Sequence, residues 1–299
     1  MIQIEEIEHN EYVYDIEVDD NHNFYANNLL VHNCNYFVFD EIVKKKYKNP
    51  TAEETTNFLI ELIDKVIQPT IDKNIDNDFR LMNGYVSLMK SSLEAVATHG
   101  LVTGISKYAL RVTNDEGKDL LHNPKMKIVG MPNIAVSTPK KVAKALDETI
   151  NIIFDKDNNA LIKYINDYKK EFCTYLPSEI SQLTGVSSVE KYKDSKTAIY
   201  WASKASIIYN NLLKKLDLND EFDLVGENDK VMLIYLKNNP ITKADVLAYK
   251  EDAFLFKTGL NKYIDYDRHF KVLFLDNVQR FTDAISWSTT KASSMKKLF

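Results

Sequence analysis

The sequence predicts an α+β fold in which strand-rich segments come first and helices dominate the C-terminal half. Two patterns lead to this prediction. Before about residue 131, short runs alternate apolar and polar residues, as in residues 125–130, which is typical of strands. After that point apolar residues recur at helical spacing, beginning with Val142, Ala145 and Leu146.

The composition is that of an ordinary folded protein. The chain has 299 residues, 44% of them hydrophobic and 27% charged, and a formal net charge of -5. This charge excludes a strongly basic coat protein for nucleic acids but allows a local basic groove. Because we find no membrane-spanning apolar run and no signal-peptide pattern, we expect a cytoplasmic protein. Of the two cysteines, Cys34 and Cys173, the second is expected to be a buried apolar residue.

Residues 1–33 form a series of predicted short strands. Two of them, residues 24–26 and 29–31, are separated by the turn signal Asn27-Asn28. Further alternating runs lie at residues 2–4 and 12–18. Strands this short cannot bury a core alone, so they need the rest of the chain or a partner chain.

The triplet His32-Asn33-Cys34 ends this segment with side chains that can cut and rejoin a backbone. The side-chain amide of Asn33 can attack its own carbonyl carbon, and His32 can assist by proton transfer. Cys34 can hold an acyl group as a thioester. Each residue alone would be a common structural residue, but their order together points to autoprocessing.

Residues 1–34 resemble the C-terminal segment of an intein, through the stretch YDIEVDDNHNFYANNLLVHNC. The resemblance implies a small β-rich fold of the Hint type for residues 1–33. It also assigns the catalytic residues: Asn33 as the cyclising asparagine, His32 as the penultimate histidine, His22 as the histidine that supports cyclisation, Asp15 as the aspartate that tunes the nucleophiles, and Cys34 as the first residue of the downstream flank.

The resemblance suggests a split intein, since no N-terminal intein segment precedes Met1 in this sequence. We expect a companion chain to complete the β fold and to pass its upstream flank to Cys34. Cyclisation of Asn33 would then release residues 1–33, with no cofactor required.

For residues 34–130 the sequence predicts a strand-rich α+β unit. Residues 34–40 predict a buried strand that contains Phe37, Val38 and Phe39. The capping-box sequence TAEE at residues 51–54 begins a helix that Pro69 kinks or ends. The further predicted strands are residues 84–88, 93–96, 108–112 and 125–130.

Residues 131–299 predict a mainly helical unit. Its first helix has Thr138 as the expected N-cap and Pro139 in its first turn. The other predicted helices are residues 161–172, 196–216 and 242–253, and residues 230–237 form a predicted strand.

Residues 34–299 resemble the C-terminal portion of family B DNA polymerases, above all those of tailed phages. The segments that carry the resemblance are TGISKYALRV (103–112), PKMKIVGM and STPKKVAKAL (within 124–146), GVSSVEKY (185–192), IIYN (207–210), DKVMLIYLKNNP (229–240) and IDYDRHFKVLF (264–274). It implies that residues 34–130 finish the palm, that residues 131–299 form the thumb, and that the chain binds primer–template DNA. A phage-encoded chain would act in the host-cell cytoplasm.

Cys34 matches the position just after the metal-binding Asp-Thr-Asp motif of that family. The resemblance therefore places the two aspartates on the companion chain and no metal ligand on this one. Polymerisation needs divalent metal held by carboxylates, so Mg²⁺ is expected only in the assembled polymerase. Glu94 matches an acidic palm residue near the metals, although a solvent-exposed strand carboxylate explains it equally well.

The resemblance also implies contacts with DNA. The positions in the palm are Lys107 and Tyr108, from a minor-groove motif that has Ile105 and Ser106 in place of two lysines, and Lys125 and Lys127, from a strand that grips the primer. The positions in the thumb, near the duplex backbone, are Ser187, Ser188, Lys191 and Lys204. The alternative for Lys125 and Lys127 is a solvated strand face.

The tail from Lys291 to Phe299 resembles a peptide that binds a sliding clamp, and a frayed basic tail is the alternative. Two other functions remain open for the whole chain. It could be a fragment that binds DNA or a clamp but does not splice, or an inactive remnant without a partner.

Overall fold

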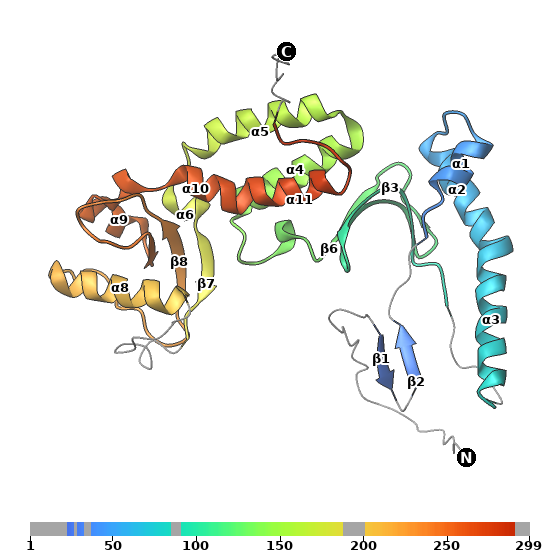
Figure 1. The fold of residues 1–299 in the computed structure, drawn as a ribbon, viewed down its shortest axis with the longest axis horizontal. Coiled ribbons are helices and arrows are strands. Elements are labelled where there is room, and N and C mark those ends of the chain that lie inside the picture. Colours follow the sequence, from blue (N-terminus) through green and yellow to red (C-terminus); the bar gives the residue numbers. More distant parts are fainter. Residues whose placement is uncertain (1–22, 27–28, 33–36, 85–90, 188–200, 291–299) are drawn as a thin grey trace, which may run out of the picture.

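The computed structural model describes residues 23–26, 29–32, 37–84, 91–187 and 201–290, and in the first two ranges the backbone alone. It confirms the predicted α+β class, with antiparallel sheets joined by helical segments (Figure 1). The helices and strands are, in order, β1 (Asn23–Ala26), β2 (Leu29–His32), α1 (Asp40–Lys46), α2 (Ala52–Leu62), η1 (Ile63–Ile67), α3 (Gln68–Leu81), β3 (Ala95–Gly104), β4 (Lys107–Asp115), β5 (Lys118–Asp119), β6 (Lys125–Val129), η2 (Pro132–Ile134), α4 (Lys140–Asp155), α5 (Asn158–Phe172), α6 (Pro177–Ile180), β7 (Gln182–Gly185), α8 (Trp201–Lys215), β8 (Lys230–Tyr235), β9 (Val246–Tyr249), α9 (Asp252–Thr258), η3 (Leu260–Tyr263), α10 (Tyr266–Phe270), η4 (Lys271–Leu275) and α11 (Asp276–Asp283).

Strands β1 and β2 form an antiparallel hairpin in which Asn23 pairs with His32 and Ala26 with Leu29. The hairpin confirms the two strands predicted at residues 24–26 and 29–31. The strands predicted at residues 2–4, 12–18 and 84–88 lie outside the described residues, in full or for most of their length.

The largest described sheet has the order β3-β4-β5, with β6 also paired to β4. Helix α2 packs on this sheet, where the buried hydroxyls of Thr56 and Thr113 lie 2.7 Å apart. The predicted capping box begins the helix: the Glu54 backbone N–H donates to the Thr51 hydroxyl over 3.1 Å, and the Thr51 N–H donates to the Glu54 carboxylate over 2.8 Å.

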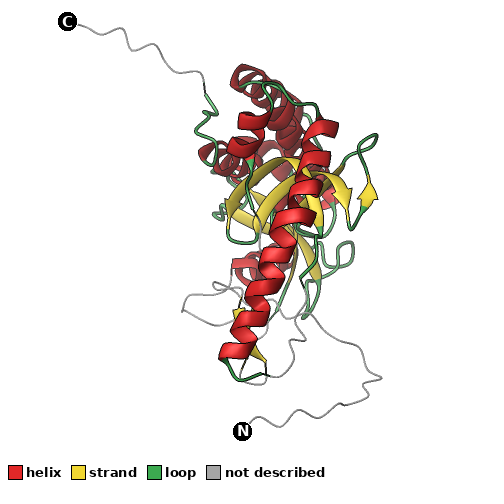
Figure 2. Ribbon diagram, turned by 90° about the vertical axis from the view of Figure 1, so that its right-hand side faces the viewer, coloured by secondary structure: helices red, strands yellow, loops and turns green. Residues whose placement is uncertain are grey.

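The helix does not end at Pro69. It widens into the π-helical turn η1 and continues as α3 to Leu81, running in front of the strands in Figure 2. The N–H of Gln68 donates to the carbonyl of Ile63, five residues back. Pro69 follows at the start of the next α-helical stretch, where its missing N–H is tolerated. The local widening therefore accommodates the proline without a break.

The strand predicted at residues 34–40 is wrong for the part that is described. Residues 37–39 form no strand, and helix α1 begins at Asp40. The side chains of Phe37 and Val38 are 58% and 77% exposed. A strand needs a neighbour for its backbone N–H and C=O groups, and no strand in the described part of the chain pairs with this segment.

Helices α4, α5 and the run from α10 to α11 pack around an aromatic cluster. The Tyr168 ring lies 4.6 Å from the Phe274 ring and contacts Phe172 and Phe270. The first of these helices begins one residue later than a Thr138 N-cap would require. Pro139 is the N-cap, and the Thr138 hydroxyl instead donates to the carbonyl of Pro132 over 2.7 Å.

A further sheet has the order β7-β8-β9, and helix α8 packs against it. We call this sheet, together with helices α6, α8 and α9, the distal unit (Figure 1). The helix predicted at residues 242–253 is wrong, because Val246–Tyr249 is strand β9, paired with β8. Leu247, Ala248 and Tyr249 are fully buried. A short apolar run of this kind has no periodicity that separates a helix from a buried strand. Its pairing with the edge of β8 makes this segment a strand.

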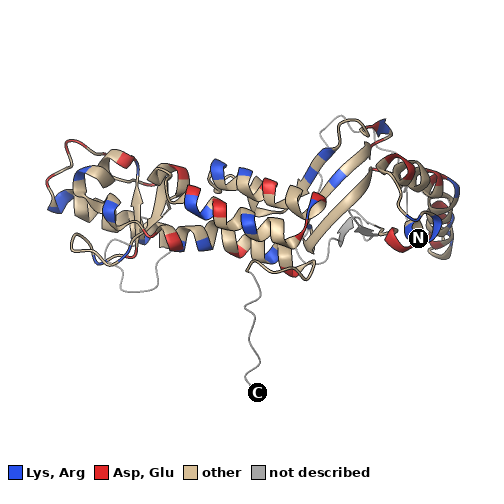
Figure 3. Ribbon diagram, turned by 90° about the horizontal axis from the view of Figure 1, so that it is seen from above, with Lys and Arg blue, Asp and Glu red and all other residues tan. Residues whose placement is uncertain are grey.

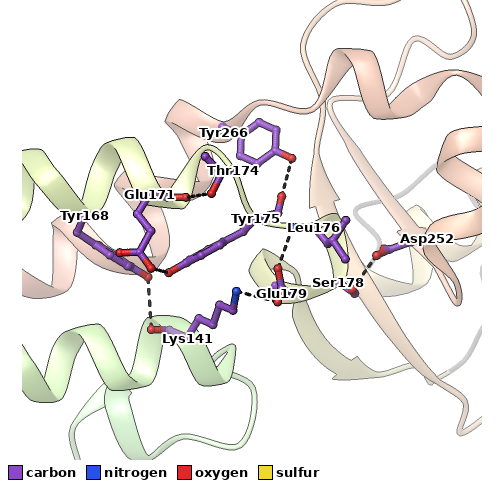
Figure 4. A network of polar contacts seen from close by, with 10 residues as sticks. All are labelled: Lys141, Tyr168, Glu171, Thr174, Tyr175, Leu176, Ser178, Glu179, Asp252 and Tyr266. Carbon is purple, nitrogen blue, oxygen red and sulfur yellow. Dashed lines mark hydrogen bonds and ion pairs between the residues drawn. The ribbon is translucent and has the colours of Figure 1, made fainter.

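Figure 4 shows a polar network that joins the central helices to this distal unit. The Tyr175 hydroxyl donates to the Glu171 carboxylate over 2.5 Å, and the Tyr175 carbonyl accepts from the Tyr266 hydroxyl over 2.9 Å. The ammonium of Lys141 lies 2.8 Å from the Glu179 carboxylate and 3.8 Å from the centroid of the Tyr175 ring.

Nearby Cys173 is exposed, so its predicted burial is wrong. Among the described helices, none combines the length and hydrophobicity needed to cross a membrane.

His269, in α10, is a buried histidine that ties this helix to β8. Its Nε2 accepts the backbone N–H of Tyr235 over 2.8 Å, and its ring lies 4.8 Å from the Tyr235 ring. Burial, with a smaller contribution from Arg268, lowers the pKa of His269 to about 4, and Asp265 opposes the shift. The imidazole is therefore neutral in the folded state at pH 7.

We predict that His269→Phe destabilises the protein by about 1–3 kcal/mol at pH 7, because the Tyr235 N–H loses its acceptor. The folded-state pKa lies below the unfolded value of about 6.5. The difference in unfolding free energy between wild type and His269→Phe is therefore fully present above that value and is lost as the pH falls towards 4.

Urea unfolding at pH 7, 5.5 and 4 tests this, with His122→Phe, at an exposed histidine, as the control. A difference between wild type and His269→Phe that is the same at all three pH values would contradict it.

Candidate functional site

One face of the sheet formed by β4 and β6 gathers three of the residues predicted to contact DNA. In the antiparallel register Tyr108 lies opposite Val129, Leu110 opposite Lys127, and Val112 opposite Lys125. Since side chains alternate along a strand and paired residues share a face, Tyr108, Lys125 and Lys127 project from the same side. Figure 3 shows basic residues on the strands of this sheet.

Within this group the two lysines differ. The ammonium of Lys127 forms an ion pair with the Glu94 carboxylate, which comes from just before β3. The hydrogen bond to Glu94 raises the pKa of Lys127, and the nearby Tyr108 contributes to the same shift. Lys125 is exposed. The sequence pattern does not distinguish Lys125 from Lys127, whereas in the structure a carboxylate lies beside Lys127.

Lys107 begins β4 and, by strand alternation, projects from the face opposite Tyr108. It follows the turn at Ile105-Ser106, where Ser106 has a positive φ of 51°. Gly130, directly after β6, has φ +60°, and a Cβ there would lie 2.2 Å from the Ser106 carbonyl oxygen. Gly130 therefore supports the turn that delivers Lys107 and Tyr108. Sequence reasoning did not assign this role; a glycine ending a predicted strand was the available signal.

The second group of predicted residues lies on the distal unit. The carbonyl of Ser187 accepts the Ser203 hydroxyl over 2.6 Å, which ties the end of the β7 segment to α8. Lys204, the next residue of α8, is exposed. In Figure 1 the helices α4, α5 and α11 lie between this unit and the β4–β6 sheet, so the two groups are spatially separate. Ser188 and Lys191 lie outside the described residues.

Most of the residues predicted to take part in splicing lie outside the described residues: Asp15, His22, Asn33 and Cys34. His32 ends β2, opposite Asn23, and only its backbone is described. The tail from Lys291 to Phe299 also lies outside.

Possible metal ligands are not clustered in the described part of the chain. The described residues contain no group of three or more His, Cys, Asp or Glu side chains with the arrangement of metal ligands. Glu94, the acidic residue predicted to lie near the metals, has the Lys127 ammonium as a partner.

We predict that Gly130→Ala destabilises the protein by more than Gly117→Ala. Both glycines have a positive φ, which costs a non-glycine residue about 1–2 kcal/mol, but a Cβ at Gly117 meets no atom within 4 Å. Only the change at Gly130 adds a collision with backbone. Urea unfolding of the two variants measures the difference, and equal destabilisation would refute the supporting role of Gly130.

No family model matches the chain. Over 282 residues it is 25% identical to the DNA-directed DNA polymerase of Escherichia phage RB69, and this match covers 88% of the chain and 30% of that protein. Over 171 residues it is 26% identical to the DNA-directed DNA polymerase of Enterobacteria phage T4, covering 53% of the chain and 19% of that protein.

A shorter and closer match is to the DNA polymerase of Thermococcus litoralis, 48% identical over 52 residues, or 15% of the chain and 3% of that protein. The chain thus spans 30% or less of the length of these curated relatives. Through these matches the chain is homologous to the family B DNA polymerases of phages and archaea.

Proposed function

We propose that this chain supplies the palm end and the thumb of a family B DNA polymerase, and that a companion chain joins it by protein splicing. The observation that carries the polymerase part is the match to a phage DNA polymerase over 88% of the chain. The part of the chain outside this match is similar in length to residues 1–33. The splicing part rests on the chemistry of the His32-Asn33-Cys34 triplet and on the hairpin that leads to it.

In the DNA-binding role, the β4–β6 face holds the end of the primer–template duplex. Lys125 and Lys127 offer charge to backbone phosphates, and Tyr108 lies beside them. Ser187 and Lys204 contact the backbone further along the duplex, as do Ser188 and Lys191. Contacts of this kind position DNA without reading its sequence. The ligands for Mg²⁺ belong to the companion chain in this proposal, and the tail from Lys291 binds a sliding clamp.

In the splicing role, the β1–β2 hairpin leads to the proposed catalytic residues. Asn23 and His32 pair at the open end of the hairpin, and the residues next to them in the sequence are His22 and Asn33. His22 and His32 then assist Asn33 by proton transfer and hydrogen bonding, and Asp15 tunes the nucleophiles.

The reaction proceeds in three steps. First, the acyl group of the companion's upstream flank, held as an ester or thioester on the first nucleophile of the companion's N-terminal intein segment, passes to the sulfur of Cys34. The bond to that first nucleophile breaks, the nucleophile leaves with the proton of the Cys34 thiol, and a thioester to Cys34 forms. Next, the Asn33 side-chain nitrogen attacks the Asn33 carbonyl carbon, which breaks the bond to Cys34 and leaves residues 1–33 with a terminal succinimide. Finally, the freed amine of Cys34 attacks the thioester carbonyl, and the acyl group moves from sulfur to nitrogen to form a peptide bond.

We predict that co-expression with a companion that carries the N-terminal intein segment yields a ligated product and free residues 1–33, both detected by mass spectrometry. Asn33→Ala should abolish release of residues 1–33 while allowing the thioester to form. Cys34→Ala should abolish ligation.

Asn28→Ala, in the link between β1 and β2, serves as the control and should splice. Normal ligation by Asn33→Ala would refute the splicing assignment. A chain that binds primer–template DNA but always keeps residues 1–33 would establish the non-splicing alternative.

We predict that Lys125→Ala weakens binding of primer–template DNA by this chain severalfold and reduces the slope of log affinity against log salt by about one, because one phosphate contact is lost. Fluorescence anisotropy over a salt series measures both quantities. The matched control is Lys118→Ala, an exposed lysine on β5 that changes the net charge equally. Identical behaviour of the two variants would contradict the assigned face.

A further inference from the structure

The joint between the β3–β4 sheet and helix α4 contains an ion pair that neither the resemblance nor the proposed function uses. His99 of β3 and Arg111 of β4 are cross-strand partners, and both face the C-terminal end of α4. The Arg111 guanidinium donates two hydrogen bonds to the Asp155 carboxylate, over 2.5 and 2.8 Å. It also lies 5.3 Å from the centroid of the Phe154 ring, which the His99 ring approaches to 5.5 Å.

Asp155 occupies an unfavourable place for a carboxylate. It is the last residue of α4, and the last turn of this helix contains no basic residue. A negative charge there opposes the helix dipole. The bond to Arg111 offsets this cost and lowers the pKa of Asp155. The helix therefore gains from Asp155 only while its end is docked on β4.

The ion pair between Arg111 and Asp155 fixes the orientation of its partners more than it stabilises the fold. The Arg111 and Asp155 side chains are 20% and 50% exposed, and partly solvated ion pairs contribute little free energy. A two-pronged bond between guanidinium and carboxylate, however, fixes the relative orientation of its partners. The apolar contacts of Leu101 and Ala109 with the central helices hold the same joint together, but apolar contacts are non-directional.

Beside the ion pair the joint has a hollow of about 260 Å³, between His99 and Leu101 of β3, Ile153 and Phe154 of α4, and Trp287 after α11. The hollow is open to solvent, and His99 at its edge is exposed. The sheet and the helices therefore do not pack against each other there, and the ion pair is the directional contact next to this hollow.

Strand β4 connects this joint to the proposed DNA face. Arg111 pairs with Met126, which lies between Lys125 and Lys127 on β6. The same two strands therefore carry the lysines on one face and the ion pair on the other. Helix α4 in turn lies between the sheet and the distal unit that carries Lys204 (Figure 1).

We infer that Arg111 and Asp155 are positioning residues that set the angle between the β4–β6 sheet and the helical unit, and so align Lys125 with Lys204 along one DNA backbone. The alignment with DNA rests on the proposed function, whereas the angle does not. Neither residue touches the DNA in this inference.

The angle is measured in the full-length chain without DNA. Spin labels on cysteines introduced at Lys118 and Lys214, both exposed, report the distance between β5 and α8 when Cys34 and Cys173 are replaced by serine. We expect Arg111→Ala and Asp155→Ala each to broaden the distance distribution. The reversed pair, Arg111→Asp with Asp155→Arg, should narrow it again, whereas Arg111→Lys, which keeps the charge but loses the fork, should leave it broad.

A distribution that stays narrow in folded Arg111→Ala or Arg111→Lys would overturn the inference, and so would a reversed pair that fails to narrow it. Thermal unfolding checks that each variant folds. The Arg111→Lys substitution keeps the test available if Arg111→Ala does not fold.

Affinity for primer–template DNA separates this role from direct contact. Arg111→Ala should weaken binding severalfold with an unchanged salt slope, whereas Lys125→Ala lowers the slope. A lower slope in Arg111→Ala would make Arg111 a phosphate contact and overturn the positioning role. A wild-type chain that does not bind DNA would refute the proposed function, while the label distances would still test the angle.

Discussion

Strand β4 pairs with strands on both of its edges, and these two registers fix where the side chains of the sheet lie. Its register with β6 places Tyr108, Lys125 and Lys127 together, and its register with β3 places Arg111 beside His99. Because side chains alternate along a strand, one face carries charge while the other docks on helices. A one-residue slip would exchange these faces, and the turn that Gly130 supports lies where this register begins.

Carboxylates modify what the basic residues of this sheet can do. Glu94 forms an ion pair with Lys127, and Asp155 forms one with Arg111. These two basic residues are therefore engaged in contacts within the protein. Lys125 is exposed on the same face as Lys127, which makes it the lysine on which the proposed DNA contact chiefly depends. The distinction comes from contacts between residues far apart in the sequence, such as Glu94 and Lys127.

The proposed splicing site and the proposed DNA-binding unit meet near residue 34. Just after that junction, Phe37 and Val38 are apolar, largely exposed and without a strand partner in the described part of the chain. Within the described part of the chain, the segment next to the proposed splice junction thus lacks the neighbouring strand that a buried strand would need.

Local sequence patterns were enough to predict the α+β class, the capping box at Thr51, the β1–β2 hairpin strands and the strands β4 and β6. These follow from alternation, turn residues and side-chain caps within a few residues of one another. The sequence also suggested the chemistry proposed for His32, Asn33 and Cys34, which depends on residue type and order. Contacts in the folded chain were needed to establish that Val246–Tyr249 is a strand, that Lys127 has a carboxylate partner and that Arg111 binds Asp155 at the end of α4. Each of these depends on a neighbour distant in the sequence, and local patterns contain no record of which neighbour that is.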